Sequence, residues 1–398
     1  MGKPKVRFKG YTDDWEQRKL GELAEIVGGG TPSTGVDSYW DGDIDWYAPA
    51  EIGEQIYLES SQRKITEEGL NKSSAKILPI GTVLFTSRAG IGKTAILLKE
   101  GCTNQGFQSI IPNKEKLDSY FIFTRSEELK RYGETVGAGS TFVEVSGKQM
   151  ANMELVMPKT MSEQRKIGEY FASLDHLITL HQRKCENAQK LKKYMLQKMF
   201  PKNGTNVPEI RFEGFKDAWE QRKLGNIAIR ESKCDISSKD LPAVEYEDVI
   251  ANEGKLNKNI LLKQIHKKGI VFDGTQVLYG KLRPYLHNWF NPDFKGVAVG
   301  DWWVLKPINI DKSFLYRLIQ TKQFDDVANQ STGSKMPRAD WNLVSNIEIA
   351  VPHSAQEQKK TGEYFEMLDH LITLHQHKCE ELKNIKKFML QNMFVQEK

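Results

Sequence analysis

The chain has 398 residues, of which 27% are charged and 39% hydrophobic, and its formal net charge is +5. This length predicts two or three domains, and the hydrophobic fraction supports globular cores, which excludes a disordered or fibrous chain. No run of about 18 apolar residues predicts a membrane span, and residues 1–5 lead into no apolar secretory segment. The four cysteines form no CxxC pair, so we expect a soluble cytoplasmic protein with reduced thiols and neither a zinc ribbon nor a disulfide framework.

The opening segment of the chain occurs twice. Residues 4–21 (PKVRFKGYTDDWEQRKLG) match residues 208–225 (PEIRFEGFKDAWEQRKLG) at 12 of 18 positions. Two copies so far apart indicate duplication of a whole structural unit and not a solenoid, whose repeats are short and numerous.

The first variable segment, residues 22–157, mixes strand-like runs with an amphipathic stretch at residues 120–132, which predicts an α+β domain. Its predicted strands occupy residues 81–86, 95–98 and 107–111.

Two loops of this segment carry side chains suited to contacts with nucleic acid. Thr31 and Ser33 follow three glycines, whose backbone amides and neighbouring hydroxyls can hold phosphates. Arg88 and Lys93 lie in a glycine-rich turn between predicted strands, where arginine can read a guanine edge and lysine can hold the backbone.

Residues 87–94 (SRAGIGKT) resemble the phosphate-binding loop of nucleotide hydrolases, G-x-x-x-x-G-K-[ST]. Ser87 replaces the first glycine, no acidic metal-binding residue follows an obvious strand, and the second copy lacks the motif. A nucleotide-binding protein of this class is therefore the weaker alternative, and no other catalytic motif occurs.

A longer repeat follows, in which residues 163–200 match residues 357–394 at 26 of 38 positions. Its apolar positions alternate in steps of four and three, the heptad pattern of a helix that packs along one seam. A helix of this length would extend about 57 Å, and such a narrow stripe is poorly buried alone. We therefore expect the two copies to bury each other as an antiparallel pair that acts as a rigid spacer between two domains. The seam residues of the first copy are Ile167, Phe171, Leu174, Ile178, His181, Cys185 and Ala188.

Histidines at equivalent seam positions, His181 and His375, invite a metal-site hypothesis. The five-residue spacing between His176 and His181 does not place a ligand pair on one helix face. We interpret the seam histidines as packed side chains, and Cys185 and Cys379 as small buried hydrophobes.

The linker 201–208 is rich in Pro, Gly and Asn, as domain joints are, and a second variable segment, residues 226–351, follows it. Both variable segments close with a similar tail, residues 139–158 and 333–352, so they are predicted to be divergent copies of one α+β domain. Loop residues of the second segment that offer cations or a stacking ring are Lys281, Arg283, Tyr285, Lys335 and Arg338.

The whole chain resembles a specificity subunit of a type I restriction–modification system. The resemblance is carried by the paired helix ends KKYMLQKMF and KKFMLQNMF, the WEQRKLG openings, and GGGTPST, GTVLFTSRAGIGKTAI and NQGFQSI in the first variable segment. It implies two related α+β target-recognition domains separated by two long antiparallel helices, with an internal pseudo-two-fold repeat. The corresponding boundaries are 1–158 and 201–352 for the domains, and 159–200 and 353–398 for the helices.

The resemblance also implies partners and a mode of action. Each domain would read one half of an asymmetric bipartite site in double-stranded DNA, and the helices would set the gap and bind two modification subunits. Two restriction subunits would complete the complex, and no membrane is involved. The subunit itself would be non-catalytic and would carry no cofactor or metal, with S-adenosylmethionine, ATP and Mg²⁺ bound by the partner subunits.

The charge of the chain qualifies this expectation. The first long repeat has 8 basic and 4 acidic residues, whereas the second has 6 of each, so most of the net charge lies on one helix. Because neutralised phosphates dominate affinity for DNA, we expect weak binding by the isolated chain. A two-headed coiled-coil scaffold that binds proteins alone is the main alternative from another class.

Overall fold

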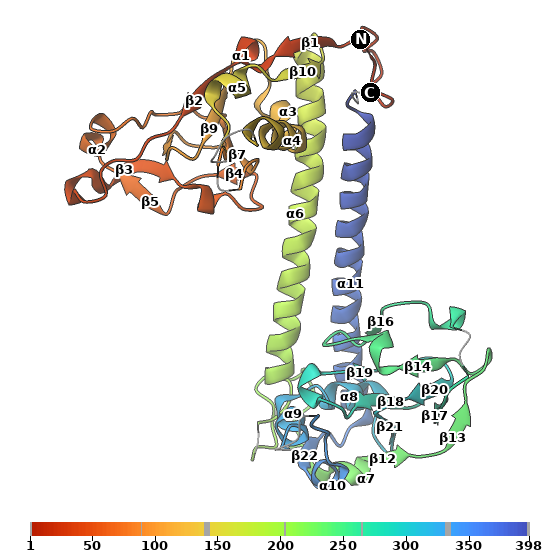
Figure 1. Cartoon of the computed structure of the whole chain (residues 1–398). Coiled ribbons are helices and arrows are strands. Elements are labelled where there is room, and N and C mark those ends of the chain that lie inside the picture. The colour runs from red at the N-terminus through yellow and green to blue at the C-terminus, as the bar shows by residue number, and fades with distance from the viewer. Residues whose placement is uncertain are drawn as a thin grey trace. The chain divides into compact units, whose positions relative to one another are not determined.

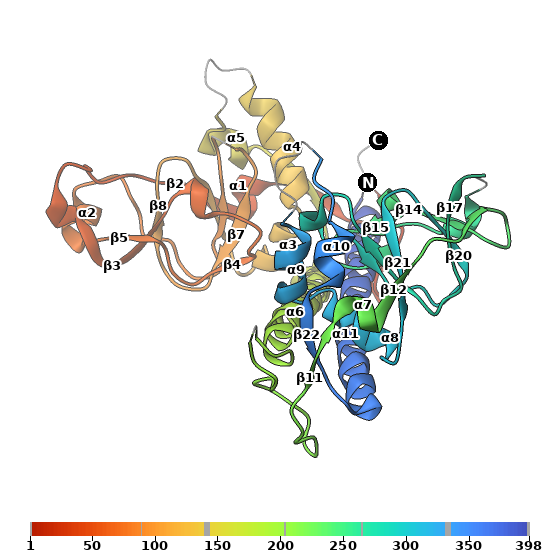
Figure 2. The ribbon, with the colours of Figure 1, turned by 90° about the horizontal axis from the view of Figure 1, so that it is seen from below.

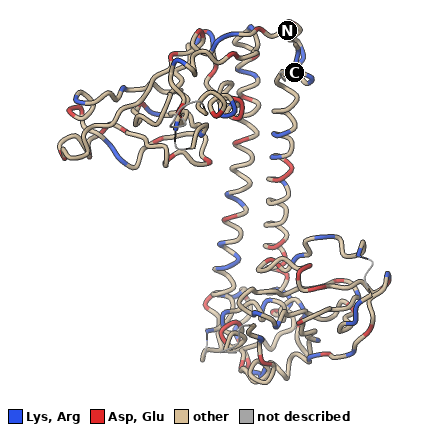
Figure 3. The backbone as a smooth tube through the Cα atoms, viewed as in Figure 1, with Lys and Arg blue, Asp and Glu red and all other residues tan. Residues whose placement is uncertain are grey.

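The computed structural model describes residues 2–88, 90–138, 144–202, 204–263, 266–330 and 336–395 (Figure 1). The chain forms two compact units, unit 1 comprising residues 1–180 with 378–398, and unit 2 comprising residues 181–377. In the described part of the chain, no helix combines the length and the apolar character that crossing a membrane requires. Basic and acidic residues are interspersed along the backbone of both units (Figure 3).

Unit 1 is built on a five-stranded sheet with a smaller sheet beside it. The order in the larger sheet is β2-β9-β6-β7-β4, the smaller sheet has the order β5-β3-β8, and a separate antiparallel ribbon joins β1 to β10. The larger sheet lies between the smaller sheet and the helices α3 and α4 (Figures 1 and 2). The strands are β1 (Glu16–Lys19), β2 (Ala24–Gly28), β3 (Trp40–Tyr47), β4 (Tyr57–Leu58), β5 (Arg63–Ile65), β6 (Val83–Phe85), β7 (Thr94–Leu97), β8 (Cys102–Thr103), β9 (Gln108–Pro112) and β10 (Glu154–Met157). The short helices are α1 (Leu20–Leu23), α2 (Glu67–Asn71), α3 (Ser119–Phe123), α4 (Ser126–Gly137) and α5 (Gly147–Ala151).

Unit 2 has the same plan with different sheets. Two four-stranded sheets have the orders β12-β21-β18-β19 and β13-β17-β20-β14, β15 pairs with β16, and β11 pairs with β22 as β1 does with β10. The strands are β11 (Glu220–Lys223), β12 (Ala228–Glu231), β13 (Cys234–Ile236), β14 (Ala243–Glu245), β15 (Val249–Ile250), β16 (Lys255–Leu256), β17 (Lys268–Phe272), β18 (Val277–Gly280), β19 (Trp289–Phe290), β20 (Gly296–Val299), β21 (Trp302–Pro307) and β22 (Glu348–Val351). The short helices are α7 (Leu224–Ile227), α8 (Lys312–Leu318), α9 (Lys322–Ala328) and α10 (Trp341–Ser345).

The long repeats form the helices α6 (Met161–Lys198) and α11 (Ala355–Asn392), each of 38 residues. Both units contain part of each helix. In unit 1, Lys386 donates to Asp175 over 2.6 Å, and the same pair recurs in unit 2, where Lys192 donates to Asp369 over 2.6 Å. In unit 1 Phe171 also stacks on Phe394, and in unit 2 His181 lies beside His375. Numbers that rise along α6 thus face numbers that fall along α11 in each unit, so the predicted antiparallel packing of the two helices is confirmed.

The last phenylalanine of each long repeat enters a core built by the other copy. In unit 1, the ring of Phe394 packs on Trp15, with ring centroids 6.1 Å apart, and stacks on Phe171 at 6.0 Å. In unit 2, Phe200 packs on Trp219 at 6.1 Å and on Phe314 at 5.3 Å. Each unit is therefore completed by the far end of the helix that begins in the other, which explains why both helix ends retain the MF dipeptide.

A buried ion pair joins the short repeat to the long repeat in unit 1. The guanidinium of Arg7 donates to both oxygens of Glu163, at 2.6 and 2.9 Å, and the indole N–H of Trp15 donates to the same carboxylate at 3.3 Å. The side chain of Glu163 is only 3% exposed, and its hydrogen bonds raise the pKa of Arg7.

Unit 2 repeats this arrangement. Arg211 donates to Glu357 at 2.6 and 2.8 Å, and the indole of Trp219 donates to it at 3.1 Å. The side chain of Glu357 is also 3% exposed. A buried carboxylate needs this number of donors because desolvation of an unpaired charge is strongly unfavourable.

The seam histidines make a direct contact in unit 2. The Nδ1 atoms of His181 and His375 lie 3.0 Å apart, so one ring donates and the other accepts, and at least one imidazole is neutral. The pKa of His375 is lowered by its burial and by the nearby side chains of His181 and Lys184. Among the described residues, no group of three or more His, Cys, Asp or Glu side chains could hold a metal ion.

Glu357→Ala should destabilise unit 2 while leaving unit 1 intact. The substitution leaves the guanidinium of Arg211 and the indole N–H of Trp219 without their acceptor. We expect this to lower the free energy of unfolding of unit 2 by about 3 kcal/mol. Hydrogen exchange measures this directly, because amides of β11 and β22 should lose protection while those of β1 and β10 keep theirs.

Glu363→Ala is the matched control, because it removes the exposed Lys359–Glu363 pair from the same helix and should change stability by less than about 1 kcal/mol. Equal loss of protection in both units, or a Glu357→Ala effect no larger than the control, would contradict the prediction.

Candidate nucleic-acid interface

The glycine-rich turn of unit 1 connects β6 to β7 as a tight hairpin. The backbone N–H groups of Thr86 and Gly92 donate to the carbonyls of Lys93 and Thr86, both at 3.0 Å, and the hydroxyl of Thr86 donates to the carbonyl of Gly90 at 2.7 Å. Gly92 has φ +96°, and a Cβ there would lie 2.3 Å from Lys130, so a larger residue does not fit. A phosphate-binding loop leads into a helix, whereas the strand β7 begins at Thr94. The turn therefore lacks the context of a nucleotide site.

Two other loops of unit 1 converge beside this turn. The N–H of Ser87 donates to the carbonyl of Gly106 at 2.8 Å, and the N–H of Gly30 donates to that of Thr103 at 2.8 Å. The hydroxyl of Thr31 donates to the side-chain oxygen of Gln105. The predicted residues Thr31 and Arg88 thus lie on loops that share one support, the segment 103–106.

The other predicted residues of unit 1 have separate surroundings. Arg88 lies 3.9 Å from Glu144, and both side chains are partly exposed. Ser33 is exposed, and its carbonyl accepts from the indole of Trp40 at 3.1 Å. Lys93 instead lines a cavity of about 440 Å³ with residues that include Lys130, Asp175 and Lys386.

In unit 2, the structure brings two predicted loops together around Asp301. The carboxylate of Asp301 accepts two hydrogen bonds from Arg338, at 3.2 and 3.1 Å, and lies 3.6 Å from the ammonium of Lys281. The bonds from Arg338, and the charge of Lys281, lower the pKa of Asp301. The backbone connects the same loops, because the N–H of Arg283 donates to the carbonyl of Pro337 at 2.7 Å and that of Ala339 donates to Lys281 at 2.8 Å.

The loop between β18 and β19 presents Arg283 and Tyr285 to solvent. Arg283 and His287 have positive φ values, 48° and 54°, on either side of a 3-10 turn at Pro284–Leu286. Positive φ is uncommon for such residues, and the hydrogen bonds just described hold it here. Arg283 is exposed and Tyr285 is 53% exposed. We call Lys281, Arg283, Tyr285 and Arg338 the unit 2 patch; the predicted residue Lys335 lies outside the described residues.

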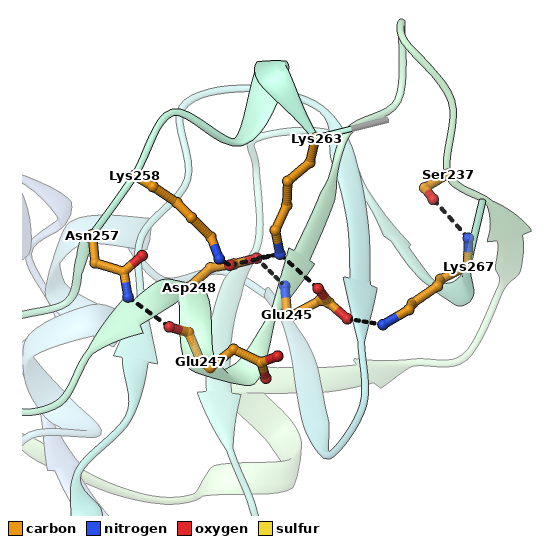
Figure 4. A network of polar contacts seen from close by, with 8 residues as sticks. All are labelled: Ser237, Glu245, Glu247, Asp248, Asn257, Lys258, Lys263 and Lys267. Atoms are coloured by element: carbon orange, nitrogen blue, oxygen red, sulfur yellow. Dashed lines mark hydrogen bonds and ion pairs between the residues drawn. The ribbon is translucent and has the colours of Figure 1, made fainter. Parts of the chain in front are cut away.

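A second basic element of unit 2 was missed by the loop-by-loop inspection of the sequence. Lys258 and Lys263 donate to the fully buried carboxylate of Asp248, at 2.8 and 2.7 Å, and Lys263 and Lys267 both donate to Glu245 (Figure 4). Burial opposes ionisation of Asp248, but the hydrogen bonds from Lys258 and Lys263 outweigh it and lower the pKa of the carboxyl. Five lysines without an acidic residue between positions 255 and 268 were the available signal.

The long helices also carry exposed apolar residues outside the heptad seam. In unit 1, Leu177 and Ile385 each precede by one residue a position of the four-and-three seam spacing, Ile178 and Lys386, so in an antiparallel pair they flank the same side of the seam. Leu180 and Phe388 follow three positions later on the same helix faces. We call these four residues the unit 1 strip; Phe388 is 57% exposed.

Unit 2 carries the same strip at the equivalent positions of the repeat. Leu371 and Leu191 flank the seam, with Leu374 and Tyr194 three positions beyond, and all four are exposed. The spacing of these residues in both repeats was the signal that could have revealed the strips from the sequence.

A family model and curated relatives both match this chain to specificity proteins of type I restriction systems. The family model described as "Type I restriction modification DNA specificity domain" matches residues 12–190 and 216–384. The MjaIX type I restriction enzyme specificity subunit of Methanocaldococcus jannaschii is 28% identical over 87% of this chain and 85% of the relative. The EcoR124I/EcoR124II specificity subunit of Escherichia coli is 29% identical over 43% of each chain.

Solved structures agree on the fold. The S subunit of a type I restriction-modification system from M. genitalium superposes with a TM-score of 0.67 at 15% identity, with all of both chains covered. A second structure, from work on complex assembly and conformational transition of the type I system, gives a TM-score of 0.50 at 16% identity, covering 96% of this chain and 98% of that one.

Proposed function

The chain belongs to the type I restriction modification DNA specificity family, whose model matches most of both units, and we propose that it selects an asymmetric DNA site in two parts, with one part read by each unit. It is a DNA specificity subunit with two target-recognition domains, and such subunits are non-catalytic. The alternatives of a scaffold that binds only proteins and of a nucleotide-binding enzyme are wrong, because this family match extends over both halves of the chain.

The proposal of two unlike half-sites is supported by the contrast between frame and loops. Both units share the Arg–Glu–Trp contact, the terminal phenylalanine and the antiparallel ribbon. Their loops differ: unit 1 presents Arg88 beside Glu144, whereas the unit 2 patch surrounds Asp301. Because base edges are read by specific donors and acceptors, different loop chemistry favours different half-sites.

The proposed DNA contacts divide into base-reading and phosphate-holding groups. Arginine forms bidentate hydrogen bonds to guanine, so we assign base reading to Arg88, Arg283 and Arg338, and stacking to Tyr285. Residues assigned to phosphate contacts are Thr31, Ser33, Lys93, Lys281 and, outside the described residues, Lys335. Several of these cations are already paired with carboxylates, which supports the expectation that the isolated chain binds DNA weakly.

The two strips support docking of two modification subunits, one per strip. Exposed apolar residues that repeat at equivalent positions on two helices form a surface that another helix can cover. The strips occur once in each unit, so two copies of one partner fit better than a single unlike partner.

In the proposed complex, the chemistry belongs to the partners. The modification subunits would supply S-adenosylmethionine-dependent methylation, and two restriction subunits would supply ATP- and Mg²⁺-dependent cleavage. This chain would contribute the choice of site and the placement of the modification subunits on it.

Exchange of one variable segment tests the two-part recognition. Replacing residues 22–157 with the equivalent segment of a relative that has a different site should change one half-site and leave the other unchanged, because the frame contacts are retained. Methylome sequencing of cells that express the complete modification complex reads both half-sites. Exchange of residues 226–351 is the reciprocal control, and a change of both half-sites in either exchange would contradict the proposal.

Arg283→Asn tests base reading by the unit 2 patch. Asparagine tolerates the positive φ at this position, so the loop should keep its conformation while losing the fork of donors. We expect discrimination at one base pair of one half-site to fall by about tenfold or more, measured by competition binding of the assembled complex with substituted DNA duplexes.

Lys359→Asn, which removes an exposed cation from α11, is the control for loss of charge. A uniform decrease in affinity for all duplexes in Arg283→Asn would assign Arg283 to the DNA backbone and contradict base reading.

Phe388→Glu tests the docking strip of unit 1. A charge in the centre of a buried apolar contact should weaken that contact at least about a hundredfold, so native mass spectrometry should show one modification subunit per chain where the parent chain binds two. The double variant with Tyr194→Glu should bind none.

Lys383→Glu introduces a glutamate at an exposed position of α11 on the other side of the seam from the strip and should leave two modification subunits bound. Retention of both subunits by Phe388→Glu would refute docking at the strip.

A further inference from the structure

A short arch in unit 2 displays two leucines to solvent. Between β16 and β17, a 3-10 turn at Ile260–Leu262 directs Ile260 into the apolar cluster that contains Phe272 and Trp302. The next two side chains point outward, with Leu261 65% and Leu262 79% exposed. Leu262 is the most exposed large apolar side chain in the described part of the chain.

The arch is held in this conformation from both ends. Lys258 on one side and Lys263 on the other donate to the buried carboxylate of Asp248, as Figure 4 shows. The side chain of Asn259 accepts from the N–H of Leu261 at 3.0 Å and fixes the turn. A loose loop could fold its leucines against the domain, whereas these contacts keep Leu261 and Leu262 outside. The leucines are thus held ready for a partner that covers them.

The charge around the arch indicates what that partner is. Residues 255–263 and 266–268 contain five lysines and no acidic residue. Lys258 and Lys267 bind carboxylates but remain about half exposed, and Lys268 is exposed. An apolar tip surrounded by cations is suited to a nucleic acid, whose phosphates border a stack of apolar base faces.

The arch is also connected to the unit 2 patch. Tyr246, which lies between the two acidic residues that hold the lysines, donates from its hydroxyl to the carbonyl of Leu282, within the patch loop. On the same side, the N–H of Asn252 donates to the carbonyl of His287 at 3.1 Å. The segment 245–248, which holds the lysines of the arch, is therefore hydrogen-bonded to the loop of the unit 2 patch.

We propose that Leu261 and Leu262 form a wedge that enters between two base pairs of the half-site read by unit 2 and partly unstacks them. Lys258 and Lys267 hold the phosphates that border the opened step. The ion pairs with Asp248 and Glu245 keep the wedge rigid. Binding therefore does not carry the additional entropic cost of ordering this loop. This inference rests on the proposed reading of a half-site by unit 2. It adds recognition through the deformability of the DNA, which favours flexible pyrimidine–purine steps.

The test uses the complete modification complex and duplexes that carry its methylated site. 2-Aminopurine is placed in turn at each purine of the unit 2 half-site, except at the base that is methylated, because that base leaves the stack for its own reaction. The parent complex should raise the fluorescence at one step. Leu261→Ala/Leu262→Ala should abolish that rise and weaken binding about tenfold.

Leu343→Ala, which truncates an exposed leucine of the same unit on α10, is the matched control and should keep both the fluorescence and the affinity. Unchanged fluorescence in the double variant, or no rise at any step with the parent complex bound, would overturn the wedge. Loss of bound modification subunits with the DNA response retained would assign the leucines to a protein contact and also overturn it. If the parent complex binds no specific site, the proposed function fails, and that outcome is recognised before any variant is made.

Discussion

Each unit depends on one buried carboxylate at the start of a long helix. Glu163 and Glu357 are satisfied by an arginine fork and an indole N–H from the short repeat. These bonds fix the opening segment against the helix, next to the core that the terminal phenylalanine of the other helix completes. Because removal of any donor leaves a desolvated charge, the three residue types are retained together in both copies.

This dependence separates a shared frame from variable loops. The sheets of the two units differ in strand number and order. Each unit nevertheless has an equivalent two-stranded ribbon, β1 with β10 or β11 with β22, and part of each long helix. Loops that lie away from the carboxylate are free to carry different side chains. In both units a carboxylate lies beside an arginine, Glu144 at 3.9 Å from Arg88 and Asp301 at 3.1 Å from Arg338. Both pairs are partly exposed, so each guanidinium remains accessible to solvent.

Exposed apolar side chains have a different meaning at different places on this chain. On the helices they recur at equivalent positions in both units, which is consistent with a shared partner. On the arch they occur in unit 2, among lysines, which is consistent with DNA. The net charge of the whole chain distinguishes neither surface, since Asp248 and Glu245 pair with three of the five lysines of the arch.

Local patterns determined much of this protein from the sequence alone. The duplication, the α+β class and the two seam-forming helices were predicted and are confirmed, because heptad spacing and repeated motifs are properties of neighbouring residues. The antiparallel pairing followed from two stripes that needed burial. The family was also identified from its motifs.

Only the tertiary structure decided which loops meet. Asp301 gathers Lys281 and Arg338, and Asp248 gathers Lys258 and Lys263, through contacts between residues far apart in the chain or on opposite sides of a turn. Such contacts leave no periodic signal, so the sequence identified the loops of Lys281 and Arg338 but not the carboxylate between them, and it identified neither the arch nor its leucines. Burial and exposure are decided by the packed chain as a whole, and they separate the residues that hold each unit together from those that remain available to its partners.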